Sequence, residues 1–503
     1  MKKILINTFS NYVFKGSLII LNIIAIPIFI NEVGSGNYGL LILASTFLAN
    51  FFVFDLGILA GVTKFVATYK AKEDQASINK VISTTLFISI CFGVLICLVI
   101  FTLINLGLFE YLKGKSEFME DAKAIFLIAG LLSVIAWPIK VFDASLQGLQ
   151  KFVSLNFFKG IGKIISILLA VYFAKNDFPL TYIFIALNFE LFFLILLLGY
   201  VLKRSLPDLT LSFDYVSKQT FLIIFSFSSW IMLAQIAVLI EYQVDTLIIG
   251  LFLPIAAIAA YVVTIYPFRI IHQISGLAAS AIMPAVAEMH AIKGDDGIEP
   301  FVIYGSRWHN ALLSSTALAT FICCYPFINI WMDGQFNQYI WIAQLSCLFQ
   351  LIWQANAMVG QVYIGAGHSK KLGLIAIVTA FFNLIFSIIL VKLIGLEGVI
   401  IGTILAGLMG EVLFLLTCFA DIRVSRKKYI FHSVLKGQLP AIGCFIIFLP
   451  FFIQIQSIES WSSLIIIFSL IITTMLLASF FFTASKNDRR TIARYLKEHS
   501  ING

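Results

Sequence analysis

The sequence predicts an all-α polytopic membrane protein with about fourteen transmembrane helices. Hydrophobic residues make up 60% of the 503 residues and charged residues only 12%, whereas soluble globular chains carry about 25% charged residues. The apolar residues are collected in runs of about 20 or more, the length that a helix needs to cross a bilayer core of about 30 Å. The formal net charge of +8 is therefore attributed to basic cytoplasmic loops rather than to nucleic-acid binding.

The predicted helices follow one another with short polar connections. Each is an apolar run with few charged residues, and Phe, which occurs 49 times, is frequent in these runs. The predicted spans are 10–31, 38–62, 81–108, 124–146, 155–174, 180–201, 221–250, 255–286, 308–331, 339–364, 372–393, 398–420, 434–455 and 461–483.

The distribution of Lys and Arg predicts the orientation, because cytoplasmic segments are enriched in these residues. With the N-terminus inside, 26 of the 34 Lys and Arg residues are assigned to the inward side and only five to the outward side. The remaining three, Lys15, Lys140 and Arg269, lie within spans. We therefore expect both termini in the cytoplasm.

The longest polar connection, 202–220, falls between the sixth and seventh spans and divides the chain into two halves. Both halves open with two spans joined by a short outward turn, and repeated halves are typical of transporters. We expect four parts: an N-terminal six-helix bundle (1–201), a cytoplasmic linker (202–220), a C-terminal six-helix bundle (221–420), and two extra helices with a cytoplasmic tail (421–503).

Several short motifs recur in a familiar order. They are an opening helix from Asn11 to Pro27, GSGNYG at 34–39, FDLG at 54–57, LQGLQKF at 146–152 with Asn156, VDTLIIG at 244–250 and AAY at 259–261. Because of these motifs, the chain resembles the polysaccharide-type (O-antigen or repeat-unit) flippases of the multidrug/oligosaccharidyl-lipid/polysaccharide exporter superfamily. The resemblance extends to about residue 420. The resemblance implies two six-helix bundles around a central cavity. It also implies movement of a lipid-linked oligosaccharide across the bacterial inner membrane by alternating access.

Basic residues at membrane depth are the first candidates for a site, because a charged side chain at the centre of a span costs about 2.5–3.5 kcal/mol. At 1.5 Å per residue, the eleven residues from Ile164 to Ala174 span only about 16 Å, so Lys163 is placed near the midplane. The same count places Lys15, Lys140 and Lys159 in the inner third of the membrane, and Arg269 about 21 Å from the outer end of its span. The predicted basic, substrate-binding cavity consists of Lys15, Lys140, Lys159, Lys163, Arg269 and Arg307. The alternative is that the lysines extend to the inner headgroups.

Carboxylates within the spans are candidates for binding a coupling ion, H⁺ or Na⁺. Glu241 and Asp245 form an acidic pair four residues apart, while Glu190 and Glu411 lie near the midplane, where each could balance a lysine or be protonated. Asp143 shares a helix face with Lys140 and is a possible partner for it. The coupling-ion candidates are Asp55, Glu190, Glu241, Asp245 and Glu411. The alternative is a set of structural ion pairs inside a helix bundle.

The leading hypothesis is a transporter, not an enzyme: a flippase for an undecaprenyl-diphosphate-linked repeat unit, whose anionic head a basic cavity would neutralise. Membrane lipids and other polysaccharide-assembly proteins are further expected partners. The sequence has no G-x-x-x-x-G-K-[ST] motif, and its seven cysteines lack zinc or redox spacing, so no cofactor or metal is expected. A cation-coupled multidrug antiporter is the main alternative, although its site should be acidic. A membrane-bound polymerase or glycosyltransferase is less consistent with the short outward loops.

Overall fold

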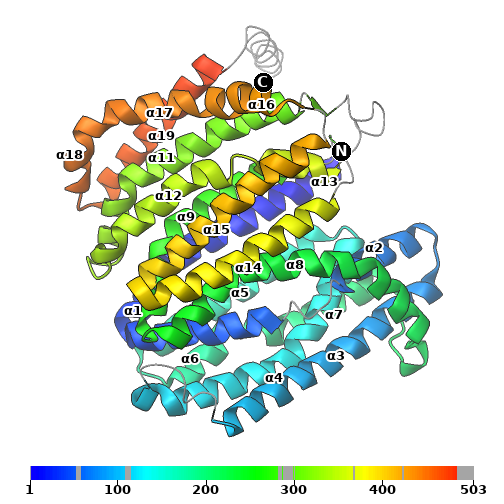
Figure 1. The fold of residues 1–503 in the computed structure, drawn as a ribbon. Coiled ribbons are helices and arrows are strands. Elements are labelled where there is room, and N and C mark those ends of the chain that lie inside the picture. The colour runs from blue at the N-terminus through cyan, green and yellow to red at the C-terminus, as the bar shows by residue number, and fades with distance from the viewer. Residues whose placement is uncertain are drawn as a thin grey trace, which may run out of the picture. The chain divides into compact units, whose positions relative to one another are not determined.

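The computed structural model describes residues 2–51, 58–107, 115–280, 286, 298–299, 301–365, 369–421 and 424–483. Within these ranges the chain is almost entirely helical and contains no strand (Figure 1). Eleven helical stretches of this part are long and apolar enough to cross a membrane. One of these stretches, Gly16–Leu48, covers parts of the first two predicted spans, and the predicted spans 221–250 and 339–364 fall outside the set. The structure thus confirms the all-helical, polytopic fold class.

The chain divides into two compact units, residues 1–261 with 387–399 and residues 262–386 with 400–503. The helices that begin in the first unit are α1 (Lys2–Phe51), α2 (Ile58–Ala71), α3 (Gln75–Asn105), α4 (Lys115–Gly148), α5 (Phe152–Lys175), α6 (Leu180–Leu187), α7 (Glu190–Ser205), η3 (Phe213–Tyr215), α8 (Lys218–Phe252) and α9 (Ala256–Ser280). The four-part division expected from the sequence stays a prediction.

The second unit contains the rest of α9, the first part of α14 (Ser369–Ile394) and most of α15 (Leu396–Thr417). Residues 387–399, which join these two helices, belong to the first unit. The other elements of the second unit are η5 (Phe301–Gly305), α11 (Ser306–Trp331), η6 (Asn337–Tyr339), α12 (Ile340–Trp353), α13 (Ala357–Gly365), η7 (Cys418–Ala420), α16 (Arg426–Tyr429), η8 (Ile430–Leu435), α17 (Lys436–Phe448), η9 (Leu449–Phe451), α18 (Phe452–Gln456) and α19 (Trp461–Thr483). The last two predicted spans therefore correspond to α16–α18 and to α19, which pack against α11.

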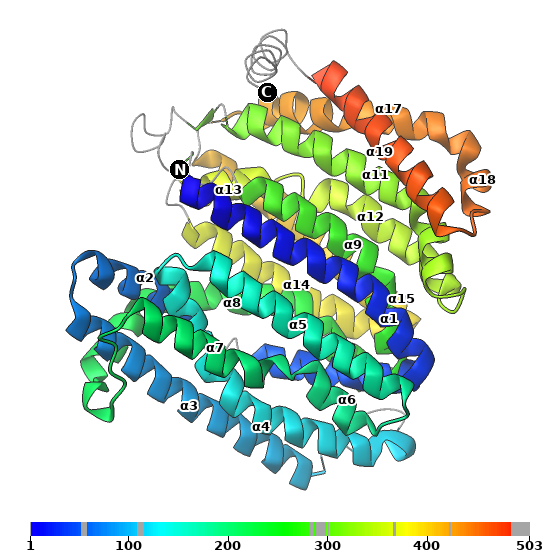
Figure 2. The same ribbon diagram turned by 180° about the vertical axis from the view of Figure 1, so that it is seen from behind.

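The helix α1 consists of two arms that meet at Gly34. This glycine has φ of 83° and ψ of 157°, a conformation that is almost restricted to glycine because a Cβ atom would clash with the backbone. The chain reverses its course there, so that the two arms form a hairpin (Figure 2). The turn expected at 34–39 is therefore present, and Gly34 is the residue that makes it.

A second interruption separates α6 from α7 at Asn188 and Phe189. The amides of Leu191 and Phe192 bond to carbonyls three residues back instead of four, at 3.0 and 3.1 Å. This shift leaves the Leu187 carbonyl without its usual partner in the helix, since each carbonyl in an α-helix accepts from the residue four positions on. The predicted span 180–201 is thus two helices with a backbone acceptor exposed between them.

The polar connection around residues 206–217 is attached to the N-terminal part of α3 rather than free. Asn79 on α3 donates to the Thr210 hydroxyl at 2.7 Å, and the Ser217 amide donates to the Thr84 hydroxyl at 3.1 Å. At the start of α3, hydrogen bonds from Ser77 lower the pKa of the Asp74 carboxyl, which caps the helix. These bonds hold the connection against the first unit.

Candidate functional site

A cavity of about 550 Å³ lies within the first unit. Its walls come from both arms of α1, from the C-terminal half of α4, from α5, and from the junction of α6 and α7. Most of the lining is apolar, with aromatic rings contributed by Phe14, Phe29 and Tyr38. The hairpin at Gly34 is what brings both arms of α1 to the same space.

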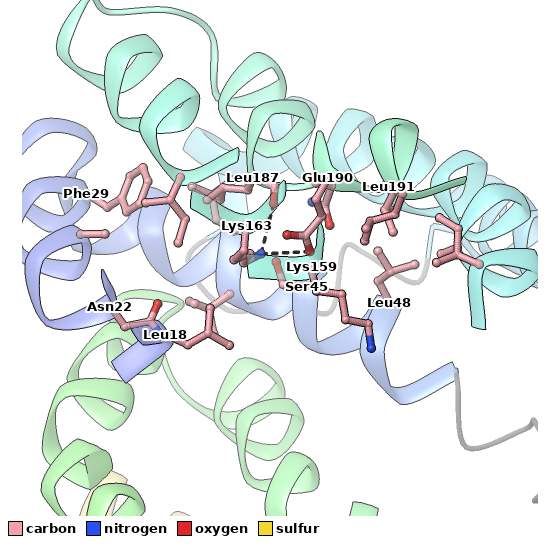
Figure 3. A pocket seen from close by; sticks show the side chains of 18 of the residues that line it. Leu18, Asn22, Phe29, Ser45, Leu48, Lys159, Lys163, Leu187, Glu190 and Leu191 are labelled. Carbon is pink, nitrogen blue, oxygen red and sulfur yellow. Dashed lines mark hydrogen bonds and ion pairs between the residues drawn. The ribbon is translucent and has the colours of Figure 1, made fainter. Parts of the chain in front are cut away.

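Lys163 enters this cavity from α5 and reaches the α6–α7 junction (Figure 3). Its Nζ lies 3.3 Å from Oε1 of Glu190 and 3.3 Å from the Leu187 carbonyl oxygen, the acceptor that the helix interruption exposes. Ser166 accepts from the Glu190 amide at 2.7 Å and so fixes the start of α7. The Lys163 side chain keeps 33% of its surface exposed, so the ammonium is accessible from the cavity.

Lys159 lies one helical turn before Lys163 and forms an ion pair with Asp143 of α4. Asp143 also accepts from Gln147 Nε2 at 2.8 Å, and its side chain is only 9% exposed. The partner of Asp143 is thus Lys159, from another helix, where the sequence suggested Lys140 from the same helix face. Both acidic groups at the cavity bind a lysine of α5.

Three of the predicted basic residues, Lys140, Lys159 and Lys163, line this one cavity together with Asp143 and Glu190. The formal charge of these five groups is +1. The surface therefore combines two ion pairs with an excess of one lysine, and Glu190 balances a lysine, which is one of the alternatives that the sequence left open. Lys15 belongs to the first arm of α1, but its side chain lies outside the described residues.

The two predicted arginines belong to the second unit. Arg307 of α11 is buried, and its Nε donates to the His432 carbonyl at 2.6 Å, while its guanidinium lies 5.0 Å from the centre of the Tyr304 ring. These contacts join α11 to η8. Arg269 of α9 is half-buried, and no residue in the described part of the chain forms an ion pair with it.

The coupling-ion candidates lie in different places. Glu190 lines the cavity; Asp245 of α8 is buried and accepts from the Tyr261 hydroxyl at 2.9 Å; Glu411 of α15 accepts from Asn356 Nδ2. Asp55 and the side chain of Glu241 lie outside the described residues. Their roles as ion ligands stay predictions, and the described residues contain no cluster of three or more His, Cys, Asp or Glu side chains of the kind that holds a metal.

The sequence did not indicate a buried polar network in the second unit at the break between α12 and α13. Gln354 Oε1 accepts from Ser275 at 3.0 Å and Gln354 Nε2 contacts His272 Nδ1 at 2.9 Å. The Ala355 carbonyl, freed by the break between the helices, accepts from Asn310 at 3.0 Å and from the Tyr429 hydroxyl at 2.9 Å. The only signal was a scatter of single polar residues in separate apolar runs, which gives no partners.

Comparison with solved structures shows which proteins share this fold. The chain is similar to a MATE-family multidrug resistance transporter in an inward-facing conformation, with 16% identity, a TM-score of 0.65, and coverage of 81% of this chain and 95% of that one. It is also similar to the lipid II flippase MurJ, with 16% identity, a TM-score of 0.64, and coverage of 95% and 98%. A transporter of the MOP superfamily from Pyrococcus furiosus matches with 17% identity and a TM-score of 0.59, over 84% and 97%. The fold is that of a MOP-superfamily membrane transporter.

The family follows from the sequence. Residues 4–290 match the family model described as polysaccharide biosynthesis protein, which is more than half of the chain. The chain belongs to this family, and it shares its fold with the solved MATE-family transporter and with the lipid II flippase MurJ. A search of curated protein sequences finds no match to the chain.

Proposed function

We propose that the protein is a flippase that moves an undecaprenyl-diphosphate-linked oligosaccharide repeat unit from the cytoplasmic to the periplasmic leaflet of the bacterial inner membrane. The observation that carries this proposal is the cavity of the first unit, where Lys140, Lys159 and Lys163 meet. The family match and the fold shared with the lipid II flippase support it.

The chemistry of the cavity fits an anionic head attached to a lipid. Ammonium groups bind phosphate oxygens through charge-assisted hydrogen bonds, and the accessible Nζ of Lys163 provides one such group. The rings of Phe14, Phe29 and Tyr38 offer apolar surface to the less polar parts of the substrate. The lipid tail would stay in the bilayer, where its transfer to water would cost about 0.8 kcal/mol per CH₂ group.

A multidrug antiporter is the second candidate, because MATE-family structures share the fold. Such a transporter carries cations, and a cation in this cavity would meet three lysines and only two carboxylates, both already bound to a lysine. The excess of positive charge disfavours that substrate class by direct repulsion.

The test is complementation of surface-polysaccharide display in a strain that lacks the gene, with membrane abundance measured by immunoblot. Lys163→Ala should reduce display strongly at normal abundance, and Lys163→Arg should retain more display because it keeps the charge. Lys175→Ala, at the far end of the same helix, is the matched control. Full display by Lys163→Ala and by the double variant Lys159→Ala/Lys163→Ala would rule out this site.

A further inference from the structure

We infer that Asp143 and Glu190 compete with the anionic head of the substrate for Lys159 and Lys163, so that substrate loading takes up protons at these two carboxylates. This inference rests on the proposed function and assigns an exchange of protons to the same cavity. It concerns the protons exchanged on binding, which the transport of a lipid-linked sugar does not by itself require.

The geometry places each lysine in contact with one carboxylate at the wall of the cavity. Lys159 is bound to Asp143, and Lys163 lies 3.3 Å from Glu190. Both pairs line the cavity in which the substrate head would sit. One ammonium group carries one positive charge, so a diphosphate that takes over Lys159 and Lys163 removes the present partners of both carboxylates. Lys140 leaves only one further positive charge at the cavity for the two of them.

The displaced carboxylates would then be next to a new anion in a mostly apolar space. Asp143 is only 9% exposed at its side chain, and a buried charge that loses its partner is costly unless it is neutralised. A nearby negative charge further disfavours the ionised carboxylate. Protonation removes both penalties.

The exchange balances in atoms and charge. For each pair, a lysine–carboxylate ion pair, one phosphate negative charge and one H⁺ from water become a lysine–phosphate ion pair and a neutral carboxylic acid. No bond other than the new O–H bond is made. Release of the substrate on the other side restores the ion pairs and frees the protons there. The protons thus accompany the substrate and compensate its charge.

Other titratable groups face the same space, and the experiment has to separate them from the two acids. The titratable groups that line the cavity are Tyr38 from α1, Lys140 and Asp143 from α4, Lys159 and Lys163 from α5, and Glu190 from α7. Of these, Asp143 and Glu190 are the acidic partners that a phosphate would displace.

The experiment is isothermal titration calorimetry with farnesyl diphosphate as the probe and the full-length protein in phosphatidylcholine nanodiscs. Titrations at pH 7.5 in two buffers of different ionisation enthalpy give the number of protons taken up. We expect one to two protons in the parent protein and an affinity that rises up to about tenfold per proton for each unit of decreasing pH. Asp143→Asn/Glu190→Gln should bind the probe about tenfold or more tightly and take up only the protons that the probe itself gains.

Controls keep the two proposals distinguishable. Asp177→Asn removes one acidic group outside the cavity, in a left-handed conformation that Asn tolerates, and should match the parent. In one outcome, Lys159→Ala/Lys163→Ala abolishes binding, but the parent and Asp143→Asn/Glu190→Gln, the neutralised variant, take up the same number of protons. This outcome would overturn the proton exchange and still support the flippase site. Binding that is absent, or that does not depend on these lysines, would overturn both. If the neutralised variant does not fold, the parent protein alone can still test the inference. The inference is rejected if the parent takes up no protons on binding and its affinity for the probe is independent of pH between pH 6.5 and 8.

Discussion

The guanidinium of Arg307 is a buried charge whose contacts are structural. Its Nε donates to the His432 carbonyl at 2.6 Å, and a buried hydrogen bond to a charged group is worth about 1.5–3 kcal/mol. We predict that Arg307→Ala lowers the thermal unfolding temperature in detergent by several degrees. Arg307→Lys should not restore it, because an ammonium group lacks the planar fork of donors.

The exposed neighbour Lys427→Ala serves as the control for Arg307, and the affinity for farnesyl diphosphate is measured in parallel. Unchanged unfolding temperature together with lost probe binding in Arg307→Ala would mean that the residue acts in substrate binding, as the sequence suggested.

The sequence alone was enough to predict that several lysines of α4 and α5 lie near one another. Counting residues from the ends of the spans placed Lys140, Lys159 and Lys163 at similar depth, and the structure brings these three to one cavity. Their partners were not predictable. Asp143 binds Lys159, 16 residues away on another helix, because the rotation of α4 against α5 decides which side chains meet, and no local pattern encodes that rotation.

At the scale of elements, Gly34 is the residue on which the shape of α1 depends. Its φ of 83° and ψ of 157° would cost a residue with a Cβ atom about 1–3 kcal/mol, although open space surrounds the position. We predict that Gly34→Ala reduces the yield of folded protein and the probe affinity together, because the cavity needs both arms of α1. Size-exclusion chromatography and calorimetry measure the two effects.

Gly443→Ala is the matched control for Gly34, since its added Cβ also meets open space but α17 has ordinary helical geometry there, where alanine is favoured by about 0.5–1 kcal/mol. Equal behaviour of the two variants would show that the bend at Gly34 does not need glycine.

The interruptions within spans show where sequence patterns stop being informative. Gly34 and its neighbours have the composition of a turn, and a turn was expected there. The break between α12 and α13 consists of Gln354, Ala355 and Asn356, with no Gly or Pro, and hydropathy predicted one continuous span from 339 to 364. Side chains from distant parts of the chain, such as Asn310 and Tyr429, bind the freed Ala355 carbonyl. That compensation is tertiary, so the local sequence could not reveal it.

At the scale of the whole molecule, the prediction concerns membrane topology, because the helix lengths determine which segments must lie on opposite sides of the membrane. The helix α3 has 31 residues, about 46 Å at 1.5 Å per residue, which exceeds a bilayer core of about 30 Å. The segment before it, with Lys72, and the segment after it must therefore lie on opposite sides. The same reasoning applies to α19, with 23 residues or about 34 Å, whose preceding segment contains Glu459.

With both termini in the cytoplasm, reporter fusions at Glu117, Asp333 and Glu459 should be active in the periplasm. Fusions at Lys72, Asp295 and Lys427 should be active in the cytoplasm, where basic residues are enriched. Paired alkaline phosphatase and green fluorescent protein fusions measure both sides at each position, so that an inactive fusion is not mistaken for an inverted one. Because the spans alternate, a single missing or additional crossing would invert every site after it. Inversion at two or more of these six positions would contradict the arrangement of fourteen spans.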